Sequence, residues 1–527
     1  MYAQRLFTHG TKSSGRRERL CLSLGCREQS SQVTVTMVGT LLLLWIGFFL
    51  LFFLYRSQRP RNFPPGPQPI PVFGNLLQLT LDNPVEDLKK LSAQYGKVFS
   101  LYFGGRPAVV INGLQAMKEA MVTKSVDFAG RPQGLLVSHV TEGKGVVMAD
   151  YGPSWKEHKR FALMTLRSFG LGKKSMEERI LDEISYVITC LDRSVGRSMS
   201  PQTLFHKAAA NIICSIIFGI RYDHDDKYLE DMLHRFTETA KIFNGPWAMI
   251  YDTLPLVRSF PLPFQKAFQN AAVLKKMAAD MITQHKSTRE PGEPRDLIDC
   301  YLDEIEKRGD KDSPFFEDQL IIYILDIYFA GTDTTSNTML FALLYLMTNP
   351  DVQANCQQEI DTVLGEKTTV SFEDRHKMPY IQATIHEAQR LSNVVPLSIF
   401  HSTTKDTQLM GYNIPKGTLI IQNLSTVLHD EGHWKFPHDF NPTNFLNEQG
   451  EFVKPDAFMP FSMGPRVCLG ENLARMELFL LLVNLLRRYQ FVWPEDAGVP
   501  DLSPVWGVTL SPKPYKLGVR LRGDKTG

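Results

Sequence analysis

A single cysteine near the C-terminal end lies in a loop whose residue types could bind a metal. The loop reads FSMGPRVCLG over residues 461–470, and a helix-forming stretch, residues 472–486, follows it closely. The backbone amides at the start of a helix carry partial positive charge, which stabilises a thiolate nearby. A thiolate donated to haem iron favours cleavage of dioxygen. Cys468 is therefore the first candidate metal ligand.

The other positions of this loop each have a role in that interpretation. Gly464 and Gly470 let the backbone turn sharply and approach a flat macrocycle, which a Cβ would hinder. Arg466 can meet a haem propionate in a charge-assisted pair, and Phe461 can pack beside the sulfur and keep water away. Most lone cysteines are small buried hydrophobic residues. The surrounding pattern favours a ligand role for Cys468 over that alternative.

A second polar motif, AGTDTT over residues 330–335, interrupts the apolar run 321–346. Glycine and threonine both weaken a helix, so another interaction should compensate for them. Thr334 can bond to the oxygen under activation, or it can open the helix by donating to a backbone carbonyl. Asp333 can pass protons inward. The competing interpretation is a polar kink in a buried helix.

Together the two motifs resemble those of the cytochromes P450, the haem-thiolate monooxygenases, and the resemblance spans about residues 60–522. It is strongest to the vertebrate microsomal family 2 enzymes, on the stretches WKEHKRF (155–161), FGLG (169–172) and ENLARMELF (471–479). The resemblance implies a mainly α fold with a small β region. It also implies haem b with Cys468 as axial ligand and Ala330 beside it.

The same resemblance assigns three more residues to the haem. Trp155 and Lys159 match a Trp-x-x-x-Arg motif in which lysine stands at the arginine position. Lysine supplies a point charge without the bidentate fork of arginine. His401 matches a position that often contacts the other propionate, although a lone histidine is more often structural.

A charge pair further along the chain is expected to support the haem from behind. Glu387 and Arg390 lie three residues apart and so share one helix face, which alone is typical of a solvated surface pair. The resemblance implies instead a buried lock that holds the segment Pro442-Thr-Asn-Phe445. Asn444 stands where arginine or histidine is common, so the third member of the network would be a neutral hydrogen-bonding group.

The substrate is expected to be hydrophobic. The apolar, proline-broken stretch 255–264 could dip into a bilayer and admit lipid-soluble molecules. Fatty acids, steroids and xenobiotics all remain open as substrates of an unspecific monooxygenase. By resemblance, apolar side chains line a cavity suited to such molecules: Leu135, Phe243, Phe329, Val395, Leu397 and Trp506.

Electrons must come from a partner, because no dinucleotide or flavin fingerprint is evident in the sequence. The resemblance implies NADPH-cytochrome P450 reductase, with cytochrome b5 as a further candidate. We expect Lys156, His158 and Arg160 to be exposed and to join Lys454 as a dock for an acidic partner. A solvated helix face is the equal alternative.

Two other functions would share the cysteine loop. An isomerase or dehydratase would rearrange peroxides without a reductase, and a sensor or carrier would bind haem without turnover. Neither needs a proton relay, so the pair Asp333 and Thr334 favours the monooxygenase.

Length and composition are consistent with one large catalytic unit. The chain has 527 residues, and we find no internal repeat and no linker-like run after residue 75. A net charge of +2 gives no bias toward nucleic acid. Seven scattered cysteines, an odd number without zinc-type pairs, indicate a reducing compartment.

The N-terminal region indicates a membrane protein. Residues 33–55 form an uncharged run of about the 20 residues that cross a bilayer, and no small-residue cleavage site of a signal peptide follows. We expect an anchor over residues 37–55 and a basic, proline-rich hinge over 56–75 that forms a stiff spacer. The catalytic domain would then occupy 76–527.

Residues 1–36 leave the location open. Basic residues flank the anchor on both sides, so charge does not decide the topology. Met37 resembles the usual start of a microsomal family member, and translation from it would place a cytosolic domain on the endoplasmic reticulum. Alternatively, the arginine- and serine-rich extension directs the protein to mitochondria.

The elements that must position these motifs are mostly helices. Helical patterns dominate from residue 156 to about 391. A hairpin is predicted from Val98–Phe103 and Ala108–Ile111 around two glycines, and short strands return within 408–421 and 507–519.

Overall fold

The computed structural model describes residues 37–48, 59–80, 83–168, 175–309, 313–507 and 509–523. The chain divides into two compact units, Met1–Arg59 and Pro60–Gly527. In the first unit, residues 37–48 are helical and almost all exposed. Within the described ranges, no helix is long and apolar enough to cross a bilayer. The rest of the expected anchor, residues 49–55, and the extension 1–36 lie outside these ranges.

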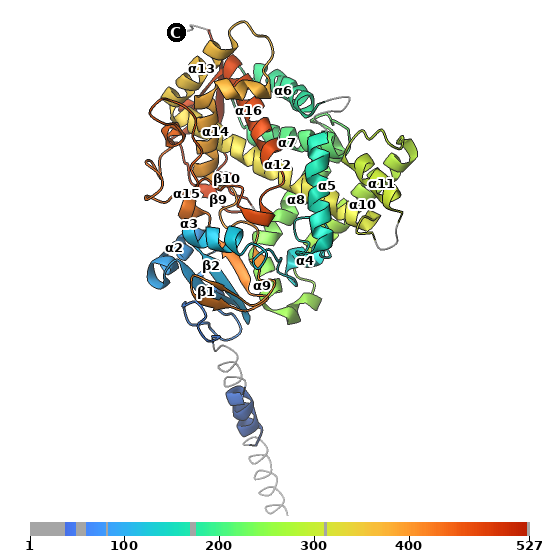
Figure 1. The fold of residues 1–527 in the computed structure, drawn as a ribbon, viewed down its shortest axis with the longest axis vertical. Coiled ribbons are helices and arrows are strands. Elements are labelled where there is room, and N and C mark those ends of the chain that lie inside the picture. Colours follow the sequence, from blue (N-terminus) through green and yellow to red (C-terminus); the bar gives the residue numbers. More distant parts are fainter. Residues whose placement is uncertain are drawn as a thin grey trace, which may run out of the picture. The chain divides into compact units, whose positions relative to one another are not determined.

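A long helix, α12 (Glu317–Thr348), runs through the middle of the second unit (Figure 1). Its sequence is apolar on nearly every side, which is typical of a helix surrounded by protein. α7 (Gln202–Ile217) packs along it so closely that a Cβ on Gly331 would lie 2.3 Å from the Cδ1 atom of Ile213. The glycine of the polar motif therefore permits this helix contact.

Further helices surround this pair and bury one large apolar core. Their starts follow local sequence signals. Ser175 and Glu178 form a reciprocal capping box, and Asp296 caps another helix through its carboxylate. The helices are α5 (Pro153–Ser168), α6 (Met176–Asp192), α8 (Lys227–Asn244), α10 (Gln265–Thr288), α11 (Leu297–Arg308), α13 (Pro350–Leu364), α14 (Pro379–Ser392) and α16 (Glu471–Arg488).

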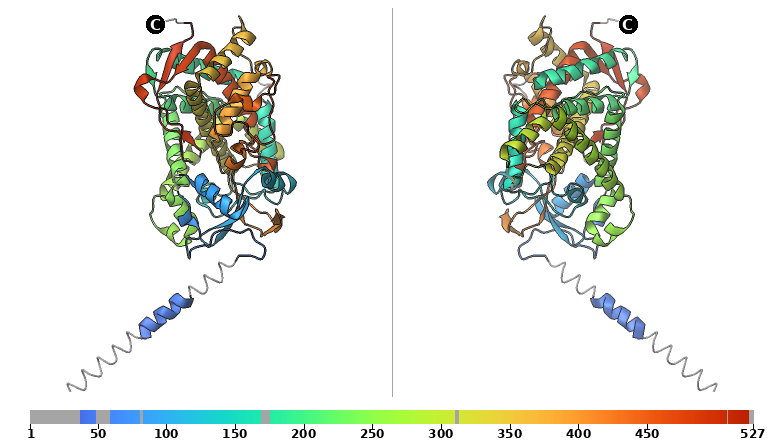
Figure 2. Two further views of the ribbon diagram at one scale, coloured as in Figure 1. Left: turned by 90° about the vertical axis from the view of Figure 1, so that its left-hand side faces the viewer. Right: turned by 90° about the vertical axis from the view of Figure 1, so that its right-hand side faces the viewer.

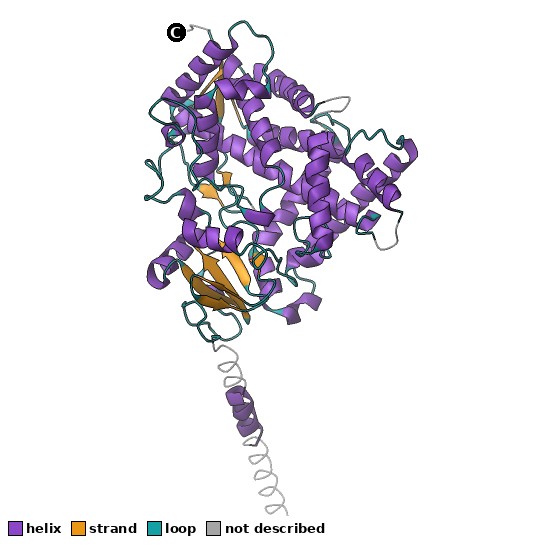
Figure 3. Ribbon diagram, in the orientation of Figure 1, coloured by secondary structure: helices purple, strands orange, loops and turns teal. Residues whose placement is uncertain are grey.

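The β structure is small. The predicted hairpin is confirmed, because β1 (Val98–Phe103) pairs antiparallel with β2 (Arg106–Ile111). β7 (Leu419–Gln422) adds to β2 in parallel, and β4 (His401–Ser402) completes the four-stranded sheet. This sheet lies at one end of the unit and a three-stranded sheet at the other (Figures 2 and 3). The remaining strands are β3 (Ser198–Met199), β8 (Tyr489–Val492) and β11 (Leu517–Leu521) of the second sheet, and the pairs β5 (Thr407–Leu409) with β6 (Tyr412–Ile414) and β9 (Pro504–Val505) with β10 (Ser511–Pro512).

The proline-rich segment is part of the second unit. The Ser100 amide donates to the carbonyl of Pro65 at 2.7 Å, and the Ser100 hydroxyl donates to that of Pro64 at 2.8 Å. A Cβ on Gly66 would lie 2.0 Å from the Ser100 carbonyl oxygen, so glycine allows this approach. These prolines therefore pack along β1 and do not stand free as a spacer.

Short elements connect the larger ones. The α-helices among them are α2 (Pro84–Tyr95), α3 (Leu114–Lys118), α4 (Leu136–Val140), α9 (Pro246–Thr253) and α15 (Ser425–Leu428). The 3₁₀-helices are η1 (Leu76–Gln78), η3 (Pro255–Ser259), η4 (Phe372–Lys377), η5 (Pro442–Phe445), η6 (Gly464–Arg466) and η7 (Glu495–Ala497), and η2 (Glu119–Thr123) is a π-helix.

Candidate functional site

The cysteine loop turns tightly between η6 and the start of α16. The Cys468 amide donates to the Phe461 carbonyl at 3.1 Å and closes the turn. Gly464 has φ +78°, and a Cβ there would lie 1.9 Å from the carbonyl oxygen of Met121 in η2. Gly470 is the N-cap residue of α16. The loop shape thus depends on Gly464 for its contact with η2.

The Cys468 side chain is both accessible and closely surrounded by protein. Burial raises the pKa of the thiol. Backbone N–H groups of Gly470 and Glu471 donate to the sulfur and oppose that rise, as does the charge of Lys159. Ala330 is also exposed although it lies midway along the core helix α12. Both motifs therefore contribute to accessible surface inside the domain.

Two arginines are buried near this loop. Arg466 donates through Nε to the Ala129 carbonyl at 2.9 Å, and its guanidinium lies 4.0 Å from the centroid of the Trp155 ring. Arg131 donates through Nε to the Val147 carbonyl at 2.8 Å. Burial lowers the pKa of Arg131 well below its ordinary value, and the charge of Arg466 lowers it further. The two guanidinium groups therefore lie close enough to repel each other.

The side-chain hydrogen bonds of both arginines go to neutral carbonyls. Within the described ranges no carboxylate lies at ion-pair distance from Arg131 or Arg466. The charges of Asp150 and Asp326 act on these arginines only from beyond ion-pair distance. Buried positive charge without a bonded anion is costly, so this region is suited to bind one. The two carboxylates of a haem would supply such anions, and Cys468 would supply the metal ligand. These residues therefore fit the cofactor that the sequence predicts.

His401 and Trp155 lie beside the arginines. His401 is buried in β4, and its Nδ1 atom lies 2.7 Å from the Phe128 carbonyl. Burial and the charge of Arg131 keep the pKa of His401 well below its ordinary value, so the ring is neutral. Trp155 donates through Nε1 to the Val146 carbonyl at 2.9 Å. Sequence reasoning missed Arg131, whose one local signal is a charged residue set between Gly130 and Pro132 in an apolar segment.

Lys159 lies against the cysteine loop. Its ammonium donates to the Pro465 carbonyl in η6 and lies 5.6 Å from the centroid of the Trp155 ring. Burial lowers the pKa of this lysine, Arg466 lowers it further, and Cys468 opposes both. The ammonium therefore lies at the loop that carries the sulfur, and its contact with a propionate stays a prediction.

The expected exposure of His158 is wrong. The residue is fully buried, with Nδ1 2.8 Å from the Ser154 carbonyl and Nε2 2.9 Å from the Tyr301 hydroxyl. Its position on α5 faces α11 and α12, where aromatic rings stack on it. Lys156 and Arg160 on the same helix are exposed, as expected. The basic dock therefore lacks its histidine.

The polar motif lies within a continuous α12. The Thr334 hydroxyl donates to the Ala330 carbonyl at 2.6 Å, which is the backbone bond expected as one of its two roles. The Asp333 carboxylate accepts from the Thr509 hydroxyl and lies 3.4 Å from His206 Nε2 on α7. Burial lowers the pKa of His206, but Asp333 outweighs it and the net shift is upward. Asp333 is therefore held by two distant segments.

Glu387, Arg390 and Asn444 meet in one buried network. Arg390 donates to both carboxylate oxygens of Glu387, at 2.7 and 2.8 Å, and neither side chain is exposed. Asn444 donates to Glu387 at 3.1 Å and to the Phe436 carbonyl at 2.9 Å. Arg390 also donates to four backbone carbonyls, including that of Pro437 at 2.7 Å. The network ties α14 to the irregular segment before the cysteine loop.

The six apolar side chains assigned to the pocket do not form one contact cluster. All six are half-buried. Phe329 and Trp506 pack on the largest core, Leu397 packs on the sheet, and Phe243 packs on the group around α9. The ring of Phe329 lies 4.1 Å from that of Phe236, centroid to centroid. These residues therefore lie at the margins of different apolar clusters.

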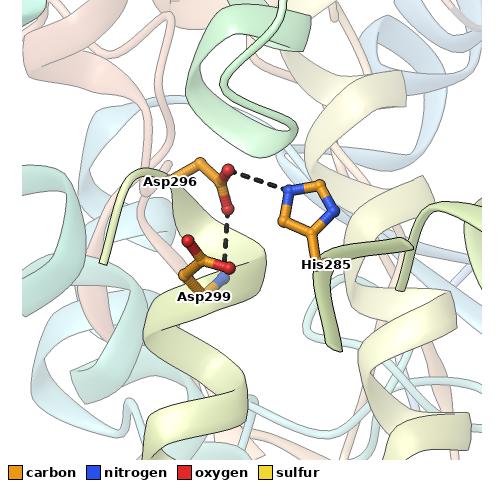
Figure 4. Close-up of side chains that lie close together, drawn as sticks. All are labelled: His285, Asp296 and Asp299. Carbon is orange, nitrogen blue, oxygen red and sulfur yellow. Dashed lines mark hydrogen bonds and ion pairs between the residues drawn. The ribbon is translucent and has the colours of Figure 1, made fainter. Parts of the chain in front are cut away.

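A second group of metal-ligating residue types is already occupied by its own contacts (Figure 4). His285 Nε2 lies 2.9 Å from Asp296, whose other oxygen accepts from the Asp299 amide at 3.0 Å. Arg295 donates to both carboxylate oxygens of Asp299. The group fastens α10 to the start of α11 as a buried ion pair.

Comparison with known proteins identifies the family of the chain. The family model described as Cytochrome P450 matches residues 64–519. The chain is 43% identical over 478 residues to cytochrome P450 2D3 of Rattus norvegicus, covering 90% of this chain and 96% of that protein. It is 40% identical over 487 residues to cytochrome P450 2F2 of the same species, covering 92% and 99%. It is 39% identical over 479 residues to cytochrome P450 2J5 of Mus musculus, covering 91% and 95%.

Proposed function

The chain belongs to the cytochrome P450 family of haem-thiolate monooxygenases, and we propose that it inserts one atom of dioxygen into a hydrophobic substrate at a membrane. The observation that carries the proposal is the enclosed but accessible sulfur of Cys468 near two buried arginines that, in the part of the chain the structure describes, have no carboxylate at ion-pair distance. A fatty acid, a steroid or a xenobiotic would be the substrate. The electrons would come from NADPH through a separate reductase.

Cys468 would be the axial ligand, and the haem would supply the activation of dioxygen. The N–H groups of Gly470 and Glu471 donate to the sulfur and stabilise its negative charge. Arg131, Arg466 and neutral His401 would hold the propionates, because they are buried donors that have no carboxylate at ion-pair distance among the described residues. Arginine suits this task because its planar fork matches a carboxylate.

Asp333 and Thr334 would manage protons on the substrate side. Asp333 can receive a proton from His206 Nε2, 3.4 Å away, whose raised pKa favours the protonated ring. The bond from Thr509 keeps the carboxylate in reach of that histidine. Thr334 would exchange its bond to the Ala330 carbonyl for one to the oxygen under activation. A hydroxyl at this position would then deliver a proton without breaking α12.

The buried lock of Glu387, Arg390 and Asn444 would keep the segment before the loop in register with α14. Asn444 replaces a charged residue and still donates to Glu387, so the network is complete without a second cation. The six half-buried apolar side chains would border the substrate space, because four of them lie at the margins of three different apolar clusters: Phe329 and Trp506 at one, Leu397 and Phe243 at the others. Such margins are suited to apolar molecules.

The protein would act at the endoplasmic reticulum, like a microsomal enzyme, with residues 37–55 as its anchor. Leu256 in η3 is 88% exposed, and Phe260, which directly follows η3, is 57% exposed. Such exposed apolar side chains are suited to contact with lipid. The exposed charges of Lys156 and Arg160 would receive the acidic face of the reductase or of cytochrome b5.

Reconstituted turnover tests the proposal. Purified full-length protein with reductase, lipid and NADPH would be supplied with fatty acids, steroids and drug-like aromatic molecules, and oxygenated products would be identified by mass spectrometry. Product carrying one atom from labelled dioxygen is the expected result. Cys468→Ala should lose the Soret band typical of carbon monoxide on cysteinate-ligated ferrous haem. Cys356→Ala, which removes a buried thiol elsewhere in the core, is the matched control. An unchanged band in Cys468→Ala would reject the ligand assignment.

A further inference from the structure

Lys159 stands where the family resemblance places an arginine, and it contacts the cysteine loop. Its ammonium donates to the Pro465 carbonyl, which belongs to η6, three residues before Cys468. The side chain passes the Trp155 ring at 5.6 Å. A point charge has thus been placed on the loop that carries the sulfur, while Arg466 and Arg131 occupy the neighbouring anion-binding region.

Lys159 also belongs to the protein surface. A concavity of about 390 Å³ opens on α5, and Lys159 forms part of its wall. Lys156 and Arg160, also in this wall, are exposed, so the concavity is basic. Its lining comprises Trp155, Lys156, Lys159, Arg160, Leu163, Met164 and Arg167. The one ammonium therefore joins this surface to the cysteine loop.

We propose that Lys159 is a positioning residue of the cysteine loop whose positive charge sets how readily the haem iron accepts an electron. The inference rests on the proposed function. In that step the ferric centre gains one electron from the reductase and becomes ferrous, and no bond to sulfur breaks. The reduced centre carries one more negative charge, so a cation near the sulfur stabilises it relative to the oxidised centre. Loss of the cation would leave the iron harder to reduce.

The position of Lys159 supports this direction. Its hydrogen bond to the Pro465 carbonyl holds the ammonium against the loop, three residues before Cys468. An acidic group of the reductase that enters the basic concavity would approach the same ammonium. The surface that receives the donor protein is therefore connected to the metal ligand by one side chain and one hydrogen bond.

Midpoint potentials of the full-length holoprotein test the inference. Lys159→Met removes the charge, Lys159→Gln removes the charge but keeps a donor for the Pro465 carbonyl, and Lys159→Arg keeps the charge. We expect both neutral variants to lower the ferrous-to-ferric ratio about tenfold at a given applied potential. For a one-electron couple this corresponds to a midpoint potential that is lower by about 59 mV. Lys159→Arg and the matched control Lys156→Met should keep the wild-type potential, because Lys156 points into the same concavity without contacting the loop.

Unchanged potentials in both neutral variants would overturn the inference. A wild-type potential in Lys159→Gln alone would also overturn it, because the lysine would then only hold the loop by a hydrogen bond. Should Lys159→Met not fold, Lys159→Gln against Lys159→Arg decides the question. A wild-type protein without the Soret band of a cysteinate ligand would reject the proposed function and the inference together. A normal band with unchanged potentials would reject the inference alone.

Discussion

Gly464 and Gly470 belong to one motif, and the structure separates their tasks. Gly464 has φ +78°, and its added Cβ would lie 1.9 Å from the carbonyl oxygen of Met121. Gly470 has φ −90°, and the nearest atom to its added Cβ is the Cys468 sulfur at 3.9 Å, an ordinary contact. Gly464→Ala must therefore displace backbone, whereas Gly470→Ala need not.

The expected cost of Gly464→Ala is a sum of two effects. A left-handed backbone costs a residue with a Cβ about 1–2 kcal/mol, and forcing extra volume into a packed site costs about 1–3 kcal/mol. The free energy of unfolding should fall by about 2–5 kcal/mol, a large share of the ~5–15 kcal/mol typical of a folded domain. Gly470→Ala loses a favourable N-cap residue, which costs about 1 kcal/mol or less.

Urea unfolding followed by tryptophan fluorescence measures both variants on the same protein. The Soret band typical of a cysteinate ligand, recorded before unfolding, reports whether the loop still presents its sulfur. Gly464→Ala should lose stability and part of this band together, because the displaced backbone carries Cys468. Equal stability of the two variants would refute the reasoning, since the close contact with Met121 would then be relieved without cost.

Three further changes test the buried network, the buried acid and the polar motif. Arg390→Met should lower the free energy of unfolding by about 3–5 kcal/mol, because Glu387 loses its buried partner. If the two residues are coupled, the double variant with Glu387→Gln should lose less stability than the sum of the two single variants. Additive losses would exclude the coupling. Burial raises the pKa of Glu477 from 4.5 to about 8. Between these two pH values the folded state keeps a proton that the unfolded state releases. The free energy of unfolding should therefore fall by up to about 5 kcal/mol as the pH rises through this interval. Glu477→Gln should lack this fall in denaturation curves recorded across the interval, and parallel pH profiles would contradict the shift. Thr334→Val should release more peroxide per NADPH consumed in reconstituted turnover. The control Thr338→Val, which removes another backbone-bonded hydroxyl of α12, should not. Equal peroxide release per NADPH in both variants would remove the role of Thr334.

Local patterns predicted the fold and the chemistry because both depend on short-range spacing. The hairpin follows from two short, mostly apolar runs around two glycines, and it was found at Val98–Phe103 and Arg106–Ile111. The long apolar run around the polar motif became α12. The proline-rich segment was harder to interpret, because proline predicts an extended backbone but not the neighbour against which it packs, here Ser100.

Other features arise from contacts between distant parts of the chain. Arg131 comes to lie near Arg466, more than three hundred residues later, and nothing in either segment indicates that the two charges share one buried region. His158 appears in a row of charged residues, and only the packing of α5 on α11 turns it toward Tyr301.

The cysteine loop and the acid–alcohol motif indicated a metal-binding thiolate and a proton relay, and their resemblance to the cytochromes P450 identified the haem-thiolate family. Both motifs are short and local, so the sequence alone shows them. Packing decided which charges support that loop. Lysine and arginine carry the same charge, so the sequence does not say which group each of them contacts. Their contacts depend on where the fold places a backbone carbonyl or a site for an anion. The long-range approach of α5 to the loop therefore placed Lys159 at Pro465, a contact that no short-range pattern encodes.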